Sequence, residues 1–269
     1  MTVAGSDSGG GAGIQADLKT FAALGVYGTS AITAVTAQNT LGVTSVHEVP
    51  VDVVAAQIEA IMSDIGADAV KTGMLSSAEI VVAVVETLRR TEAVDRLVVD
   101  PVMVAKGGDR LLREDAVGAL RTLLIPIAAV VTPNIPEAET LTGRAIRDRR
   151  DARNAARDIV HGMGAAAVVV KGGHLEGPAT DLFYDGHEFR SFTAARIATT
   201  STHGTGCTFA SAVAAYLALG REPVRAVAGA KRYVTAAIRR ALPIGGGHGP
   251  LNHLYRLPRP SAEGPRLGP

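Results

Sequence analysis

The sequence has no tryptophan and a single cysteine, Cys207. One cysteine excludes an internal disulfide framework and any cysteine-rich zinc site. Aromatic residues make up only 4% of the chain, so its core must be built from aliphatic side chains and alanine. We therefore expect a reducing compartment, in which the thiol of Cys207 is free.

The chain also has almost no net charge. Its 27 basic and 26 acidic side chains leave a formal charge of +1, which argues against a surface that holds nucleic acid by bulk charge. The basic stretch Arg147–Arg150 is bracketed by acids and is expected to be a solvated helix start. We therefore expect no nucleic-acid partner.

Long hydrophobic runs are missing as well. The longest nearly apolar run, Phe209–Leu219, is far shorter than a membrane span. The N-terminal residues lack the charged start and the apolar stretch of a signal peptide. These absences favour a cytoplasmic protein without a membrane partner.

Short runs rich in valine, isoleucine and alanine alternate with longer segments of helical period. The strands expected from these runs are Thr2–Ala4, Gly28–Ala37, Ala69–Lys71, Leu97–Asp100, Ala129–Thr132, Ala166–Lys171 and Asp181–Tyr184. The expected helices are Ile14–Leu24, Asp52–Ile65, Ser76–Leu88, Asp151–Gly164, Gly206–Leu219 and Pro223–Leu242, the third opened by a capping box of Ser76 and Glu79. Strands that are apolar throughout indicate an α/β fold, a three-layer sandwich around a mostly parallel sheet. We expect a single domain over residues 1–257 and a disordered tail over 258–269.

Polar residues cluster directly after six of the expected strands. They are Gly5-Ser6-Asp7, Gln38-Asn39, Lys71-Thr72-Gly73, Asp100-Pro101, Thr132-Pro133-Asn134 and Lys171-Gly172-Gly173. In open α/β sheets the ligand crevice lies beyond the carboxyl ends of the strands. The sequence therefore predicts one crevice lined by all six segments.

A glycine cluster covers Gly9–Gly13, and the segment Gly11–Ala16 fits the loose dinucleotide fingerprint G-x-G-x-x-A. That fingerprint also needs an acid about 20 residues further on, and the second strand ends instead in Gln38 and Asn39. A nicotinamide or flavin site is therefore disfavoured. A flexible turn and a loop that lets a ligand approach the backbone closely both remain open. A Walker A loop is absent.

The strongest signal is the segment Thr199–Ser211, TTSTHGTGCTFAS. The small residues Gly204, Thr205 and Gly206 precede an apolar helix, so successive backbone N–H groups and the helix N-terminus form a nest for an anion. Cys207 falls in the first turn, where the same field is expected to lower the pKa of its thiol. The alternative is that Cys207 is a small buried hydrophobe.

Charged residues at strand ends complete the pattern. Lys171 closes an apolar strand, which suggests a phosphate contact, and Lys231 on a long helix either joins it or extends to solvent. Asp100 closes another apolar strand, and Asn134 and Glu137 stand at a helix start. Oxygen ligands in such places suit a water-rich Mg²⁺ site, although Glu137 could simply favour a helix start.

Taken together, these segments resemble the ribokinase-like superfamily and, within it, the bacterial hydroxymethylpyrimidine/phosphomethylpyrimidine kinases of thiamine biosynthesis. The motifs that carry the resemblance are AGSDSGGGAGIQADLKT, TAVTAQNT, VKTGML, VVDPVMVAKGG, TPNIPEAE, VVVKGGH, STHGTGCTFASA and GGGHGPLNH. They run in register from residue 2 to about residue 257.

The resemblance implies a ribokinase-like α/β/α sandwich, a homodimer, and two successive phosphoryl transfers from ATP with Mg²⁺, first to the pyrimidine alcohol and then to its monophosphate. It implies catalysis at Gly204, Thr205, Gly206 and Cys207 and a pyrimidine site at Gly5, Asp17, Gln38, Met74 and Val102. It implies that ATP contacts Asp100, Asn134, Glu137, Lys171, Thr202 and Lys231, with Mg²⁺ at Asp100 and Glu137.

Two alternatives remain open. A pyridoxal or pyridoxine kinase of the same superfamily also acts on a ring with a hydroxymethyl group, but Gln38 and Met74 favour the pyrimidine. A non-catalytic pyrimidine-binding regulator on the same fold would have no need of Asp100, Glu137, Lys171 and Cys207 together.

Overall fold

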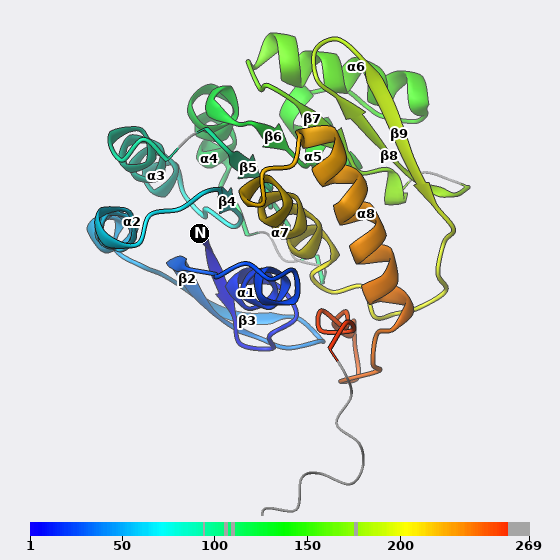
Figure 1. Cartoon of the computed structure of the whole chain (residues 1–269), viewed down its shortest axis with the longest axis horizontal. Coiled ribbons are helices and arrows are strands. Elements are labelled where there is room, and N and C mark those ends of the chain that lie inside the picture. The colour runs from blue at the N-terminus through cyan, green and yellow to red at the C-terminus, as the bar shows by residue number, and fades with distance from the viewer. Residues whose placement is uncertain (94, 105–106, 109–110, 175–176, 258–269) are drawn as a thin grey trace, which may run out of the picture.

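The computed structural model describes residues 1–93, 95–104, 107–108, 111–174 and 177–257. They form a nine-stranded sheet with helices on both faces (Figure 1). The segment 258–269, expected to be a disordered tail, lies outside the described residues. Within the described part of the chain, no helix has both the length and the apolar character needed to cross a bilayer.

The sheet is parallel at its centre and antiparallel at its edges. Its strands are β1 (Thr2–Asp7), β2 (Ser30–Gln38), β3 (Val43–Glu48), β4 (Val70–Thr72), β5 (Leu97–Val99), β6 (Val130–Val131), β7 (Val168–Val170), β8 (Ala179–Tyr184) and β9 (Phe189–Ala194). Their order is β3-β2-β1-β4-β5-β6-β7-β8-β9. In this order, the neighbours from β2 through β1, β4, β5 and β6 to β7 pair in parallel. The outer pairs, β2 with β3, β7 with β8 and β8 with β9, are antiparallel. The predicted mostly parallel sheet is confirmed.

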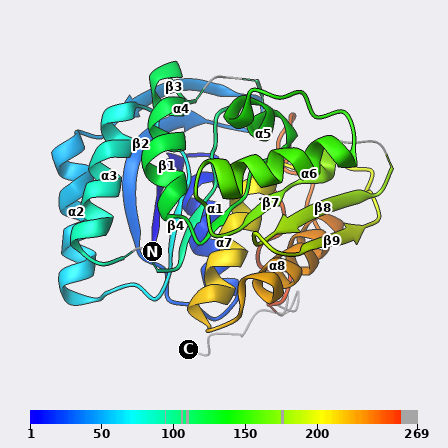
Figure 2. The same cartoon turned by 90° about the horizontal axis from the view of Figure 1, so that it is seen from above.

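Helices cover both faces of this sheet. They are α1 (Gly13–Ala23), α2 (Val51–Asp64), α3 (Ala78–Arg90), α4 (Glu114–Ala119), α5 (Ile135–Thr142), α6 (Arg149–Arg157), α7 (Thr205–Ala218) and α8 (Pro223–Arg239). Short turns of helix over Leu120–Leu124 and Ile125–Ile127 continue α4, and the turn Asp158–Gly162 continues α6; a further turn covers Gly172–His174. In Figure 2, α2, α3, α4 and α6 lie on one side of the sheet, and α7 and α8 on the other.

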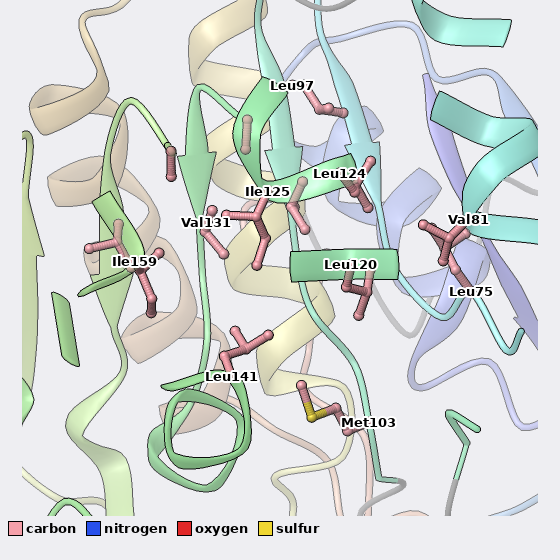
Figure 3. Close-up of a cluster of buried hydrophobic side chains, with 14 of the residues drawn as sticks. Leu75, Val81, Leu97, Met103, Leu120, Leu124, Ile125, Val131, Leu141 and Ile159 are labelled. Atoms are coloured by element: carbon pink, nitrogen blue, oxygen red, sulfur yellow. The ribbon is translucent and has the colours of Figure 1, made fainter. Parts of the chain in front are cut away.

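Two hydrophobic cores correspond to these two faces. The first joins α2 to α6 with side chains such as Leu97 and Val99 of β5, and Figure 3 shows Leu97, Leu124 and Ile125 within it. The second joins α1, α7 and α8 with Val98, which lies between Leu97 and Val99 in β5. Because successive strand residues point to opposite faces, a fully apolar strand can contribute to both cores. This arrangement confirms the three-layer α/β/α sandwich.

The sequence missed the edge strands β3 and β9 and the short helix α4. Both edge strands are largely exposed and carry many polar residues, so their patterns resemble those of loops. The capping box was placed one residue too early. Ser77 is the N-cap of α3, with its Oγ 3.3 Å from the Ile80 amide, whereas Ser76 is buried ahead of the helix.

Helix α7 begins where two loops from opposite ends of the chain meet. Its N-cap, Gly204, has a φ of 78°, a left-handed conformation that glycine adopts without strain. A Cβ at this position would overlap the carbonyl oxygen of Gly11 in the loop between β1 and α1. Gly204 is therefore fixed both by its backbone conformation and by contact with Gly11.

This double constraint predicts that Gly204→Ala lowers the melting temperature more than Gly25→Ala. Gly25 has a φ of 79°, yet a Cβ there would meet nothing within 4 Å. Alanine at position 25 therefore carries only the left-handed backbone cost, about 1–2 kcal/mol, and a loss of about 2–4 °C per kcal/mol. Thermal unfolding followed by circular dichroism tests this. Equal losses in the two variants would mean that the contact with Gly11 is unimportant.

Candidate active site

A cleft of about 730 Å³ lies beyond the carboxyl ends of the parallel strands. Each of the six polar segments that follow the predicted strands contributes at least one residue to its wall, so the predicted single crevice is confirmed. Fourteen of the fifteen predicted site residues line it: Gly5, Gln38, Met74, Asp100, Val102, Asn134, Glu137, Lys171, Thr202, Gly204, Thr205, Gly206, Cys207 and Lys231. The exception is Asp17.

Asp17 is fully buried in α1, with no exposed surface. Its Oδ2 lies 2.9 Å from the Nζ of Lys71 and accepts a hydrogen bond from the Thr2 hydroxyl. Its Oδ1 accepts a hydrogen bond from the Ser211 hydroxyl on α7. Both carboxylate oxygens of Asp17 are thus bound by protein side chains below the cleft. The expected direct contact of Asp17 with a substrate is not supported. Lys71, which the sequence did not single out as a site residue, lines the wall in its place.

The N-terminus of α7 opens into the cleft. The Thr205 amide and hydroxyl both donate to the carbonyl of Thr202, at 3.3 and 2.7 Å, which closes the turn before the helix. The amides of Gly206 and Cys207 have no hydrogen-bond partner among the described residues. First-turn amides point along the helix axis beyond its N-terminus, so these two are available to an anion in the cleft. The predicted nest is therefore present, but the Thr205 amide is not free to join it.

The thiol of Cys207 behaves differently from the prediction. Burial raises the pKa of the thiol to about 11, with Asp17 and Asp100 acting in the same direction. Lys71 and the backbone amide of Gly13 lower it, but less strongly. The expected decrease in pKa is wrong because desolvation of the thiolate outweighs the field of the helix terminus. At neutral pH the thiol carries its proton.

A lysine and two carboxylates form the second part of the site. The Nζ of Lys171 donates to Oδ1 of Asp100 at 3.0 Å, and the Thr132 hydroxyl donates to the same oxygen at 3.1 Å. Glu137 is buried at the start of α5, where it forms a reciprocal capping box with Asn134. Burial raises the pKa of Glu137 to about 7, Lys171 lowers it, and Asp100 adds to the increase.

This second part lies directly beside the α7 N-terminus. A Cβ on Gly206 would stand 3.3 Å from the Nζ of Lys171 and 3.7 Å from Oδ2 of Asp100. A side chain here would therefore fill the space between the helix start and the lysine–aspartate pair. Glycine at position 206 keeps this space open for a ligand.

The two carboxylates could hold a metal only with help from other ligands. Among the described residues, no group of three or more histidine, cysteine, aspartate or glutamate side chains is arranged around a common point. The charge of Asp100 disfavours ionisation of Glu137. A hard divalent cation that keeps several water ligands fits such a sparse set of oxygen donors.

Lys231 extends from α8 to a buried acid. Its Nζ lies 2.8 Å from Oδ2 of Asp181 on β8, whose Oδ1 accepts the Gly172 amide. Burial raises the pKa of Asp181, and Lys231 opposes that increase. Both residues line the cleft. The sequence placed Asp181 in a strand but assigned it no role.

Asp7 and His203 are two further residues that the sequence did not assign. Oδ1 of Asp7 accepts the Gly9 amide, and Oδ2 accepts the amides of Gly11 and Ala12 and lies 2.9 Å from Nε2 of His203. Burial opposes ionisation, but the hydrogen bonds from His203 and these amides lower the pKa of Asp7. The glycine cluster is therefore a loop held by Asp7, and the interpretation as a flexible turn is not supported. An acid between a strand and a glycine run was the available signal.

The remaining predicted residues surround the end of the cleft formed by β1, β2 and the loop after β4. A Cβ on Gly5 would stand 3.0 Å from the Sδ of Met74, so glycine here allows that thioether to sit against the backbone of β1. Oε1 of Gln38 accepts the Thr36 hydroxyl at 3.2 Å, and its Nε2 lies 3.4 Å from the His203 ring. Gln38 thus presents an amide that can both donate and accept.

Known proteins are similar to this chain over nearly its whole length. A family model described as phosphomethylpyrimidine kinase matches residues 7–252. A hydroxymethylpyrimidine/phosphomethylpyrimidine kinase of Rhizobium meliloti is 55% identical, over 95% of this chain and 97% of that protein. The thiamine biosynthesis bifunctional protein ThiED of Geobacter sulfurreducens is 58% identical over 94% of this chain. The chain spans only about half of that longer protein, 52% of its length.

Two solved structures illustrate the structural similarity. The phosphomethylpyrimidine kinase of Clostridium difficile 630 has a TM-score of 0.79 and 47% identity, over 88% of this chain and 97% of that one. An ADP complex of Bacillus subtilis pyridoxal kinase has a TM-score of 0.86 and 40% identity, over 94% of this chain and 95% of that one. The ribokinase-like fold is thereby confirmed, and the chain belongs to the phosphomethylpyrimidine kinase family.

Proposed function

We propose that this chain transfers the γ-phosphoryl group of ATP to 4-amino-5-hydroxymethyl-2-methylpyrimidine and then to the resulting monophosphate, in thiamine biosynthesis. One observation carries the proposal: a single cleft contains both the α7 N-terminus beside Lys171 and Asp100, and the opposite group of Gly5, Gln38 and Met74. The first group suits a transferring phosphoryl group, and the second suits a flat heterocycle. The 58% identity to a thiamine biosynthesis bifunctional protein and the 55% identity to a hydroxymethylpyrimidine/phosphomethylpyrimidine kinase support the same conclusion.

In the first transfer the hydroxyl oxygen of the pyrimidine attacks the γ-phosphorus, the bond to the β-phosphate oxygen breaks, and ADP leaves. Such transfers depend mainly on positioning and on stabilisation of charge on the phosphoryl oxygens. The amides of Gly206 and Cys207 and the ammonium of Lys171 supply donors and positive charge for those oxygens. The hydroxyl proton passes to Cys207 once its thiol is ionised. Asn134, Thr202, Thr205 and Lys231 complete the nucleotide side of the cleft.

Mg²⁺ fits the pair of Asp100 and Glu137. Lys171 pairs with Asp100, so one positive charge stands beside two acids. Burial raises the pKa of Glu137, and the charge of Asp100 adds to that increase, whereas Lys171 opposes it. When bound with ATP, the ion offsets the charge of the phosphate groups. The protein's part is to hold the two carboxylates at the mouth of the α7 nest.

The pyrimidine ring is assigned to Gln38, Met74, Gly5 and Val102. The amide of Gln38 can donate and accept at once, as an aminopyrimidine edge requires. Asp17 supports this part of the site through Lys71, without a contact of its own. We also propose a homodimer in the cytoplasm, without nucleic-acid or membrane partners, as the family resemblance implies.

A pyridoxal kinase is the second candidate. The Bacillus subtilis pyridoxal kinase has the higher TM-score of the two solved structures compared above, although its sequence identity, 40%, is lower. Overall shape therefore does not separate the two substrates, and the side chains around the ring must do so. The purely regulatory alternative is disfavoured because the cleft keeps Asp100, Glu137, Lys171 and Cys207 together.

The proposal predicts ATP consumption with hydroxymethylpyrimidine, and with its monophosphate, only in the presence of a divalent cation. A coupled assay of ADP release gives kcat/KM for hydroxymethylpyrimidine and for pyridoxal. The value for the pyrimidine should exceed that for pyridoxal. A pyridoxal value equal or greater would assign the chain to the second candidate, and no turnover of either alcohol would favour a binding protein.

The high thiol pKa predicts the pH dependence of the transfer. If the Cys207 thiolate accepts the alcohol proton, kcat should increase about tenfold per pH unit between roughly pH 7 and 9, because the ionised fraction grows by that factor below the pKa. Cys207→Asp should remove this slope, since a carboxylate is already ionised over the same range. Cys207→Ala should lose roughly 10²–10⁴-fold in kcat. A Cys207→Ala variant with the parental kcat would exclude Cys207 as the base and leave catalysis to the amides and Lys171.

Glu137 predicts a pH dependence of metal binding. Its pKa of about 7 means that the carboxyl is largely protonated below pH 7, and a metal must displace that proton. The apparent Mg²⁺ affinity in the presence of ADP should therefore decrease as the pH falls through 7. Calorimetry in two buffers of different ionisation enthalpy measures the proton release directly. Glu137→Gln should abolish this release, whereas Glu86→Gln, an exposed change on α3, should not. Unchanged proton release in Glu137→Gln would remove Glu137 from the metal site.

A further inference from the structure

Lys71 is a fully buried ammonium that the proposed reaction has not yet used. It lies in β4, and neither its side chain nor that of Asp17 has any solvent exposure. Burial of an unpaired charge is costly, whereas a paired and hydrogen-bonded charge is tolerated. Asp17 provides the pairing at 2.9 Å, and its remaining capacity is used by the hydroxyls of Thr2 and Ser211. The carboxylate is therefore an anchor that fixes the position of the ammonium.

Lys71 lies at the wall of the cleft, although none of its side chain is exposed. Asp17 does not line this wall. A Cβ on Gly73 would stand 2.7 Å from Nζ, so the glycine leaves room for the charged group. An ammonium has three N–H donors, and Asp17 accepts the one hydrogen bond from Nζ to another described side chain. Lys71 thus brings positive charge to the cleft from the side of the sheet, while Lys171 brings it from the loop after β7.

Helix α7 connects this charge to Cys207. Cys207 and Ser211 are four residues apart and therefore share one face of the helix. Ser211 donates to Oδ1 of Asp17 at 2.5 Å, and Oδ2 of the same carboxylate holds Lys71. Cys207 lies one turn closer to the cleft than this hydrogen bond. The face of α7 that carries the thiol is thus fixed against the lysine–aspartate pair.

We propose that Lys71, anchored by Asp17, is a positioning residue whose fixed positive charge favours the ionised form of the Cys207 thiol. The role deepens the proposed function and rests on it, because the thiolate is the group that accepts the alcohol proton there. The group on which Lys71 acts is Cys207, and no contact with the substrate is required of it.

The other charged groups near the thiol make Lys71 the dominant favourable one. Asp17 and Asp100 oppose ionisation, and Lys171 is offset by its own pairing with Asp100. Among the influences that lower the pKa of Cys207, that of Lys71 is the largest. Although burial acts against it, the carboxylate of Asp17 raises the pKa of Lys71 and keeps it charged.

The test follows the ionisation of Cys207 directly, without ATP or substrate. The sequence has one cysteine, so ¹³C labelling at cysteine Cβ gives a single signal whose shift reports the thiolate. Lys71→Met leaves Asp17 unpaired and could unfold the chain, so Lys71→Met/Asp17→Asn is the principal variant because it removes both charges. Lys19→Met is the matched control, since Lys19 is a lysine bound to the Gly10 carbonyl outside the cleft wall.

In the double variant the loss of Asp17 eases ionisation of the thiol, and the loss of Lys71 opposes it. Because the influence of Lys71 is the larger of the two, the onset of the thiol titration should still move to higher pH. The rate of alkylation by iodoacetamide at fixed pH should fall about tenfold per unit of that shift. Lys19→Met should change neither. Loosened packing would instead expose the thiol and accelerate alkylation. A titration onset that stays in place or moves to lower pH would overturn the proposal, whatever the kinase assays show.

Discussion

The site depends on one packing constraint, the close approach of α7 to the sheet and to the first loop of the chain. The helix is almost entirely buried from Thr208 to Leu217 and is rich in alanine, so its backbone can lie near β4 and β5. Its N-terminus then falls at the carboxyl ends of those strands. The contact between Gly204 and Gly11 fixes the end of the helix against the loop after β1. The small residues of α7 and of the first loop therefore determine where the nest lies, because they allow the backbones to approach closely.

Around that helix end the charges are arranged in three lysine–acid pairs. Lys71 pairs with Asp17, Lys171 with Asp100, and Lys231 with Asp181, each at 2.8–3.0 Å. All three lysines line the cleft, and each ammonium has a carboxylate beside it. A phosphate-bearing ligand can then attract ammonium groups that are already positioned. Because each ammonium retains an acid partner, the empty cleft does not accumulate a large positive charge.

The sequence predicted a mostly parallel sheet, the alternation of its central strands with helices, and most of the cleft wall. It could do so because apolar strands and the polar residues that follow them are local patterns, and parallel topology brings strand ends together. It did not separate Asp17, which lies below the cleft, from Lys71, which lies at its wall. The packing of α1 against α7 decides that difference, and it is not a local pattern. The predicted decrease in the pKa of Cys207 was wrong for a similar reason. A helix start can be recognised in the sequence, whereas burial of the thiol cannot.

The bond between His203 and Asp7 joins residues 196 positions apart, and the His203 amide is in turn held by the carbonyl of Gly249. Pairing over such a distance in sequence forms late, because a long loop must close before the contact is gained. During synthesis, all of β1 to β7 have emerged before His203 and Gly249, so these strands can pair while the loop ahead of α7 still lacks its partner. In a nascent chain the part of the cleft formed by the α7 N-terminus is therefore completed after the parallel part of the sheet.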